Sequence, residues 1–229
     1  MRRLAAILGF ALLAPLGAGA IDLPEYFQTA LARLSSDAPR GWAYNLTTTR
    51  KEETSLERYD PSRPKGGEWT LLRRNGLEPT TEDHERYRRY KASNASPTAR
   101  ATFEKGDIDV TSAALVRDDA ERAEFQLRFR EDVSEPLLQH LLLHLTVTKA
   151  EPTVERFTLH LLGAFSPALG VRMNQLEVTM QFSPASDDRP ALPHEMVSRF
   201  RGRLFFFIPM EEELRVTYSD FAPVIPLRK

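Results

Sequence analysis

Residues 42–48 read Trp-Ala-Tyr-Asn-Leu-Thr-Thr, and in this stretch an apolar or aromatic side chain occupies every second position. Trp42, Tyr44 and Leu46 would lie on one side of an extended chain, with smaller and polar residues on the other. A period of two is typical of a β-strand that packs one face against a core. This stretch therefore indicates a sheet protein, and the segments on either side of it extend that prediction.

The segment before this strand has a different period. Phe27, Ala30 and Leu31 fall on one face at helical spacing, and Asp22 is a suitable N-cap. We therefore expect an amphipathic helix from Asp22 to Leu34.

The segments after residue 48 alternate mostly with a period of two, and turn residues separate them. A charged helix is expected from Thr81 to about Ala92, and a short helical turn from Pro136 to His140. Because the strands follow one another closely, the pattern predicts an antiparallel meander, mainly β with a few helices (α+β). Strands are expected at 55–59, 69–73, 108–117, 124–129, 141–148, 154–162, 171–182, 196–208 and 213–220.

The composition is that of an ordinary globular protein. The 229 residues are 41% hydrophobic and 28% charged, with a net charge of -1. This balance argues against a general nucleic-acid or membrane-surface binder. The chain contains no cysteine, which excludes disulfides, thiol catalysis and cysteine-ligated zinc. No linker or repeat divides residues 21–229, so a single domain is predicted there.

The first twenty residues match the pattern of a secretory signal peptide. Arg2 and Arg3 precede an apolar stretch at 4–16, and Ala18-Gly19-Ala20 supplies small residues for cleavage after Ala20. No later segment approaches the roughly 18 consecutive apolar residues of a membrane-spanning helix. We therefore expect an exported protein without a permanent membrane span. The absence of cysteine favours the bacterial periplasm.

The segment Leu204-Phe205-Phe206-Phe207-Ile208 is apolar on both faces if it is a strand. Either a helix covers its second face or that face lines a ligand cavity. The strand predicted at 141–148 also carries a run of leucines. Plain core and ligand cavity both fit this pattern. The candidates for lining a cavity are Leu141, Leu143, Leu145, Phe205 and Phe207.

No catalytic signature is present, so a non-enzymatic protein without a cofactor is expected. His140, His144 and His160 could converge on one hairpin surface, which leaves a metal-dependent hydrolase as a weaker alternative. The acidic clusters at 118–119, 187–188 and 211–213 are interpreted as solvated turns and strand ends. In the charged helix, Tyr87 and Tyr90 are expected to form the buried stripe.

The order of these elements resembles the LolA-like superfamily of periplasmic lipoprotein carriers. The resemblance rests on the leading helix, on the strand from Trp42, and on Trp69-Thr70-Leu71-Leu72 running through Asn75-Gly76 into the second helix. It also includes the closing strands, with Arg201-Gly202-Arg203 before the phenylalanines and Tyr218-Ser219-Asp220-Phe221 at the end.

The resemblance implies a curved antiparallel sheet, or incomplete barrel, covered by helices on its concave side. It also implies a periplasmic binding protein for an acyl chain, a lipid or a lipoprotein-like apolar ligand. The alternative is an envelope interaction or stress-sensing module that binds another protein, with Arg86–Lys91 as a contact surface. The sequence does not determine the oligomeric state.

Overall fold

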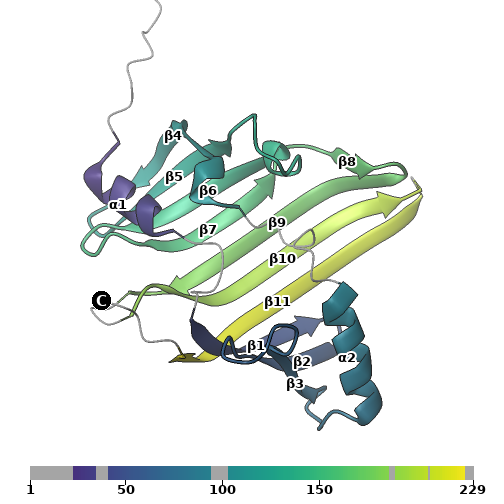
Figure 1. Ribbon diagram of the computed structural model, residues 1–229. Coiled ribbons are helices and arrows are strands. Elements are labelled where there is room, and N and C mark those ends of the chain that lie inside the picture. Colours follow the sequence, from purple (N-terminus) through teal and green to yellow (C-terminus); the bar gives the residue numbers. More distant parts are fainter. Residues whose placement is uncertain (1–22, 35–40, 94–102, 186–188, 206, 225–229) are drawn as a thin grey trace, which may run out of the picture.

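The computed structural model describes residues 23–34, 41–93, 103–185, 189–205 and 207–224. The predicted signal peptide and Asp22 lie outside these ranges. Figure 1 shows a broad sheet with one helix near each end. The elements are α1 (Glu25–Arg33), β1 (Trp42–Arg50), β2 (Glu53–Tyr59), β3 (Trp69–Arg74), α2 (Thr81–Ser93), η2 (Lys105–Asp107), β4 (Ile108–Asp118), β5 (Arg122–Phe129), η3 (Leu138–His140), β6 (Leu141–Thr148), β7 (Val154–Leu161), β8 (Phe165–Ala168), β9 (Val171–Ser183), β10 (Leu192–Leu204) and β11 (Ile208–Pro223).

The strands form one antiparallel sheet in the order β3-β2-β1-β11-β10-β9-β7-β6-β5-β4, with β8 paired to β9 outside this path. The predicted antiparallel, mainly β fold with few helices is confirmed. The sheet is not closed, since β3 and β4 end the path without pairing to each other in the described part of the chain.

The strand order departs from the predicted meander in two respects. The last strand, β11, returns to pair with β1, as in the register Leu46↔Tyr218. The connection from β3 through α2 to β4 then joins the two edges of the sheet. Both departures depend on contacts between residues far apart in the sequence, so local periodicity could not indicate them.

The main core lies between α1 and the strands from β4 to β9. Phe27, Ala30 and Leu31 are buried on one face of α1, which confirms the predicted amphipathic helix. Phe27 lies against Phe125 of β5, with 4.1 Å between the ring centroids. The alternating pattern of β6 is also seen, with Leu143 fully buried and its neighbours less so.

Both helices contact the same face of the sheet, here called the helix-covered face. Residues that pair directly across neighbouring strands point to the same face, and a line of such pairs runs from Phe125 on β5 to Ser55 on β2. α1 packs on Phe125, and α2 contacts Glu57, which lies two residues from Ser55.

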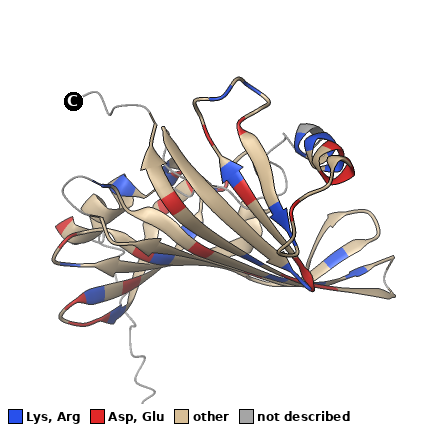
Figure 2. Ribbon diagram, turned by 90° about the horizontal axis from the view of Figure 1, so that it is seen from below, with Lys and Arg blue, Asp and Glu red and all other residues tan. Residues whose placement is uncertain are grey.

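The opposite face of β9, β10 and β11 carries cross-strand ion pairs. Arg199 contacts both Glu177 and Glu213, and Arg201 contacts Glu211 at 2.7 Å. Figure 2 shows charged residues of both signs scattered among uncharged ones along the strands of the sheet. Paired charges on one side let an antiparallel sheet face water there without a second layer.

The strand predicted at 196–208 is wrong in its last part, because the chain reverses there. Leu204 pairs with Ile208, and Phe205 adopts a left-handed backbone with φ 48°. A bulky aromatic side chain rarely occupies this conformation, and no glycine, proline or asparagine marks the turn. The apolar residues at 204–208 therefore lie at the turn of the long hairpin formed by β10 and β11. Strand β8 was missed because Pro167 interrupts its pattern.

None of the helices in the described ranges is long and apolar enough to cross a membrane.

Candidate functional site

The middle of the helix-covered face carries a strip of half-buried apolar side chains from β9, β10 and β11. Met196 and Tyr218 pack against both the main core and a second, smaller core around Tyr44 and Leu46, so the apolar surface continues from one to the other. Half-buried apolar side chains can offer contact area to an apolar molecule, because part of each side chain remains accessible. We define the apolar strip as Met173, Met196, Phe200, Leu214 and Tyr218.

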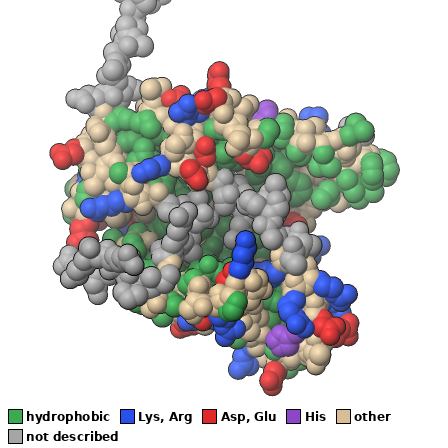
Figure 3. Space-filling model, viewed as in Figure 1, with side chains coloured by type: hydrophobic (Ala, Val, Ile, Leu, Met, Phe, Trp, Pro, Cys, Tyr) green, Lys and Arg blue, Asp and Glu red, His purple; other side chains and the backbone are tan. Residues whose placement is uncertain are grey.

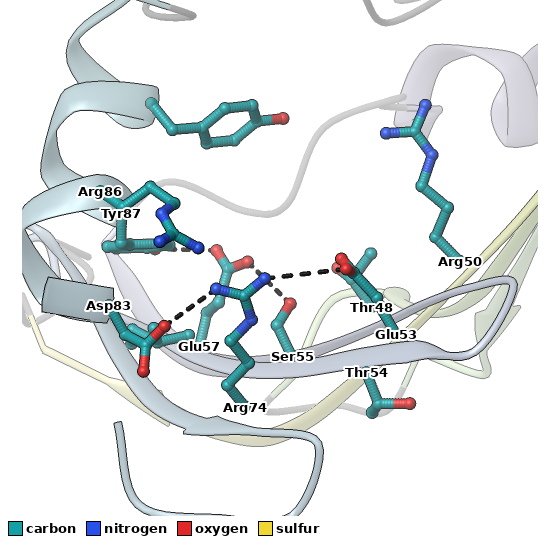
Figure 4. A pocket seen from close by; sticks show the side chains of 12 residues that line it. Thr48, Arg50, Glu53, Thr54, Ser55, Glu57, Arg74, Asp83, Arg86 and Tyr87 are labelled. Carbon is teal, nitrogen blue, oxygen red and sulfur yellow. Dashed lines mark hydrogen bonds and ion pairs between the residues drawn. The ribbon is translucent and has the colours of Figure 1, made fainter. Parts of the chain in front are cut away.

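A pocket of about 310 Å³ lies beside α2, at the β1–β3 end of the same face. Its side chains come from β1, β2, β3 and α2, and Figure 4 shows them around the pocket. Most of them are polar or charged, in contrast to the apolar strip. The lining residues are Thr48, Arg50, Glu53, Thr54, Ser55, Glu57, Leu71, Arg74, Asp83, Arg86, Tyr87 and Tyr90.

Glu57 is the polar centre of this pocket and is only 7% exposed. Its carboxylate accepts hydrogen bonds from the Tyr87 hydroxyl at 2.8 Å and from Ser55 Oγ at 3.2 Å. Lys91 Nζ lies 2.7 Å from the same oxygen that Tyr87 contacts, and 3.9 Å from the centre of the Trp69 ring. A buried carboxylate needs such partners, because burying an unpaired charge is costly.

Tyr87 and Lys91 are four residues apart, so they lie on one face of α2 and reach Glu57 together. Burial, followed by the charge of Glu57, raises the pKa of Tyr87. The phenol therefore stays protonated and donates a hydrogen bond. The predicted stripe is correct for Tyr87 and wrong for Tyr90, which is 59% exposed.

The arginines of the pocket are all paired with acids. Arg74 lies 2.9 Å from Asp83 and 3.7 Å from Glu53, and Arg50 lies 2.6 Å from Glu212. The hydrogen bond from Thr80 lowers the pKa of Asp83, and Arg74 lowers it further. The lining therefore offers donors and acceptors without excess charge, which suits a polar group that needs orientation.

The five residues predicted to line a cavity lie in two different environments. The three leucines of β6 are in the main core beneath α1, where each is at most 1% exposed. Phe205 and Phe207 lie exposed at the turn between β10 and β11, and Phe206 lies outside the described residues. The structure does not bring the two groups together. The core residues are Leu141, Leu143 and Leu145.

Sequence reasoning missed the pocket beside α2. The available signal was an acid, Glu57, on the same side of its strand as the aromatic Tyr59. A lone charge on the inward side of a strand implies a partner elsewhere. Nothing in the local pattern indicated that the partners are Tyr87 and Lys91 of the charged helix.

The three histidines considered for a metal site do not converge. His140 stacks on Phe165 with 3.8 Å between ring centres, whereas His144 and His160 form an edge contact at 5.1 Å. No group of three histidine, aspartate or glutamate side chains in the described ranges is placed to hold a metal ion. Of the acidic clusters, 187–188 lies outside the described residues, and 211–213 lies within β11 in ion pairs with arginines.

The histidine pair predicts a pH dependence of stability. Burial, followed by the neighbouring His160, lowers the pKa of His144, while Glu124 opposes the shift. The unfolded chain therefore takes up a proton near its ordinary pKa of about 6.5, which the folded protein resists. The free energy of unfolding should therefore be highest above about pH 6.5. It should fall as the pH drops from there through the lowered pKa of His144 in the folded protein.

Urea midpoints measured at about pH 7.5 and about pH 5 would check this, with a smaller difference expected for His144→Gln than for wild type. His194→Gln is the control, since His194 is exposed on β10. Equal differences in wild type and His144→Gln would contradict the assignment.

Comparisons with known proteins provide no identity. No family model matches the chain, and no curated protein matches it. A solved structure described as an isomerase-inactive variant of GphF DH1 covers 88% of this chain and 81% of that chain, at 8% sequence identity and a TM-score of 0.17. A similarity of this size carries no argument about fold or activity.

Proposed function

We propose that this protein is a non-enzymatic binding protein that holds an acyl chain, a lipid or a lipoprotein-like apolar ligand on its helix-covered face. The observation that carries the proposal is the continuity of the apolar strip between the two cores. A chain laid on this strip would gain about 0.8 kcal/mol for each methylene removed from water. The residues of the strip come from three neighbouring strands, so the binding surface belongs to the sheet itself.

The pocket beside α2 gives such a ligand an orientation. It adjoins the strip through β1 and β11, since Arg50 pairs in register with Leu214. A polar end group can exchange hydrogen bonds with the paired side chains there, while the apolar part remains on the strip. A few placed polar groups beside an apolar surface are typical of ligand sites.

In this proposal the open sheet curves around the ligand, and both helices lie on its concave side. This is the arrangement expected from the LolA-like resemblance. The proposal also includes export to the periplasm, with cleavage after Ala20. The paired charges of the pocket support a binding role, because they hold hydrogen-bonding groups in fixed positions for a polar end group.

A matched pair of variants on β10 tests the proposal. Met196 and Val197 are adjacent, and the unbroken register around them places their side chains on opposite faces of the sheet. Met196→Asp puts a charge into the apolar strip, and we expect it to weaken binding of a fluorescent fatty acid at least about tenfold. Val197→Asp makes the same change on the other face and should bind as wild type does.

Circular dichroism of both variants would show that they fold. Equal binding by the two folded variants would refute the proposed site. Native mass spectrometry of the protein purified without detergent provides a second readout. A discrete extra mass that organic solvent extracts is expected, whereas a bare mass would favour the alternative below.

A protein-binding module is the second candidate. Arg88 and Arg89 are exposed on α2, and Arg89 lies on the side away from the contact of Tyr87 with Glu57. Within the predicted contact surface at 86–91, these two arginines are available to a partner, while Lys91 is half-buried on Glu57. Arg88→Glu/Arg89→Glu would abolish a complex with an envelope protein under this candidate and leave fatty-acid binding intact.

A further inference from the structure

Two turns that are far apart in the sequence form an exposed apolar tip at one end of the sheet. The β8–β9 turn contributes Leu169, which is 99% exposed, and the β10–β11 turn contributes Phe207, which is 76% exposed. In Figure 3 hydrophobic side chains gather at this end of the molecule, where Figure 1 places the ends of the long strands. We define the apolar tip as Leu169, Phe205, Phe207, Ile208 and Met210.

Contacts between Phe205 and Gly170 hold the two turns together, so the tip has a defined structure. The backbone N–H of Phe205 donates to the carbonyl oxygen of Gly170 at 2.6 Å. A Cβ placed on Gly170 would lie 3.1 Å from the Phe205 ring, so the glycine permits this close contact. Phe205 keeps a left-handed backbone that costs energy for an aromatic residue. Strain of this kind often marks a functional site.

Among the described residues, the unpaired charges nearest the tip are basic. Residues 163–171 and 204–210 contain no charged side chain. Arg172 and Arg203 border them on one side, and Glu211, which is paired with Arg201, follows Met210 on the other. Arg172 and Arg203 are exposed and lie directly opposite each other on β9 and β10. Neither forms an ion pair with any residue that the structure describes, in contrast to Arg201, which is paired with Glu211.

We propose that the apolar tip inserts into the surface of a bilayer that contains anionic phospholipid, with Arg172 and Arg203 contacting the headgroups. A bilayer can take up protruding apolar side chains of different shapes. Its anionic headgroups attract basic side chains that lie next to the inserted residues. A second copy of this chain is a poorer occupant, because pairing two tips would gather four arginines with like charge. The inference does not depend on ligand binding by the apolar strip.

Flotation with vesicles tests the inference. Vesicles of phosphatidylcholine mixed with phosphatidylglycerol should bind wild type. Leu169→Asp and Phe207→Asp should each bind about tenfold more weakly, because each loses one apolar side chain from the bilayer. Leu77→Asp is the matched control, since Leu77 is 72% exposed but follows β3, at the other end of the sheet order. It should bind as wild type does.

The role of the arginines has its own readout. Arg172→Gln/Arg203→Gln should remove the preference for vesicles with phosphatidylglycerol over vesicles of phosphatidylcholine alone. All variants keep the same N-terminal residues, so differences among them report the tip. The Met196→Asp variant should still float with vesicles, which separates this inference from the proposed ligand site.

Three results would overturn the inference. One is the absence of wild-type binding to vesicles of either composition. Another is wild-type binding that persists unchanged in the Leu169→Asp and Phe207→Asp variants. The third is a wild-type dimer that does not bind vesicles and becomes monomeric in the Phe207→Asp variant, which would make the tip an interface between copies.

Discussion

Replacing Phe27 by alanine is expected to lower the free energy of unfolding by about 3 to 5 kcal/mol, the usual cost of removing a fully buried phenylalanine. Phe27 is 0% exposed and packs on Phe125 of β5. It is the largest side chain that α1 buries, with Ala30 and Leu31 beside it. Its loss leaves a cavity between the helix and the sheet and weakens the attachment of α1.

Urea denaturation measures this change as a lower midpoint with an unchanged slope. Phe207→Ala is the control, because it makes the same chemical change at an exposed position. It should stay within about 0.5 kcal/mol of wild type. If the two variants lost the same stability, the packing of α1 would not be part of the cooperative core.

Replacing Glu57 by alanine is expected to release α2 from the sheet. The variant leaves the Tyr87 hydroxyl without its acceptor and Lys91 without its counter-charge, in a half-buried contact. Breaking a buried ion pair from one side costs about 3 to 5 kcal/mol, and the partial exposure of Lys91 reduces this to about 2 to 3 kcal/mol. Because α2 forms one wall of the pocket, its release would also open the pocket.

Hydrogen exchange gives the sharpest measurement. The amides of α2 should lose protection about thirtyfold in Glu57→Ala, which corresponds to about 2 kcal/mol, while those of β6 change less. Glu53→Ala is the matched control on the same strand and face, since its ion pair with Arg74 is long and exposed. Equal loss of protection in both variants would show that Glu57 does not anchor the helix.

Much of the secondary structure could be predicted because each segment carries its own burial pattern. The strand predicted at 141–148 is β6 with the same bounds, and the helix of Phe27 is α1. The turn at Phe205 could not be predicted, since its three phenylalanines resemble a strand interior. Its conformation depends on the contact with Gly170 from another hairpin.

The candidate site was much less accessible to sequence reasoning. Apolar runs indicated that an apolar surface exists, but they could not separate the leucines beneath α1 from the half-buried strip around Met196 and Phe200. That distinction depends on where the two helices sit on the sheet. The pocket likewise depends on α2 reaching back to Glu57, 30 residues earlier in the chain than Tyr87.

The sequence by itself determined the local conformation of most segments, because the spacing of apolar side chains already specifies which face of a helix or strand is buried. Tertiary structure alone decided that β11 pairs with β1, that α2 closes over Glu57, and that the turns carrying Leu169 and Phe207 meet at one exposed tip. The physical reason is that periodicity records how deeply a residue is buried and not which distant residue buries it. Those partners are selected only when the whole sheet assembles.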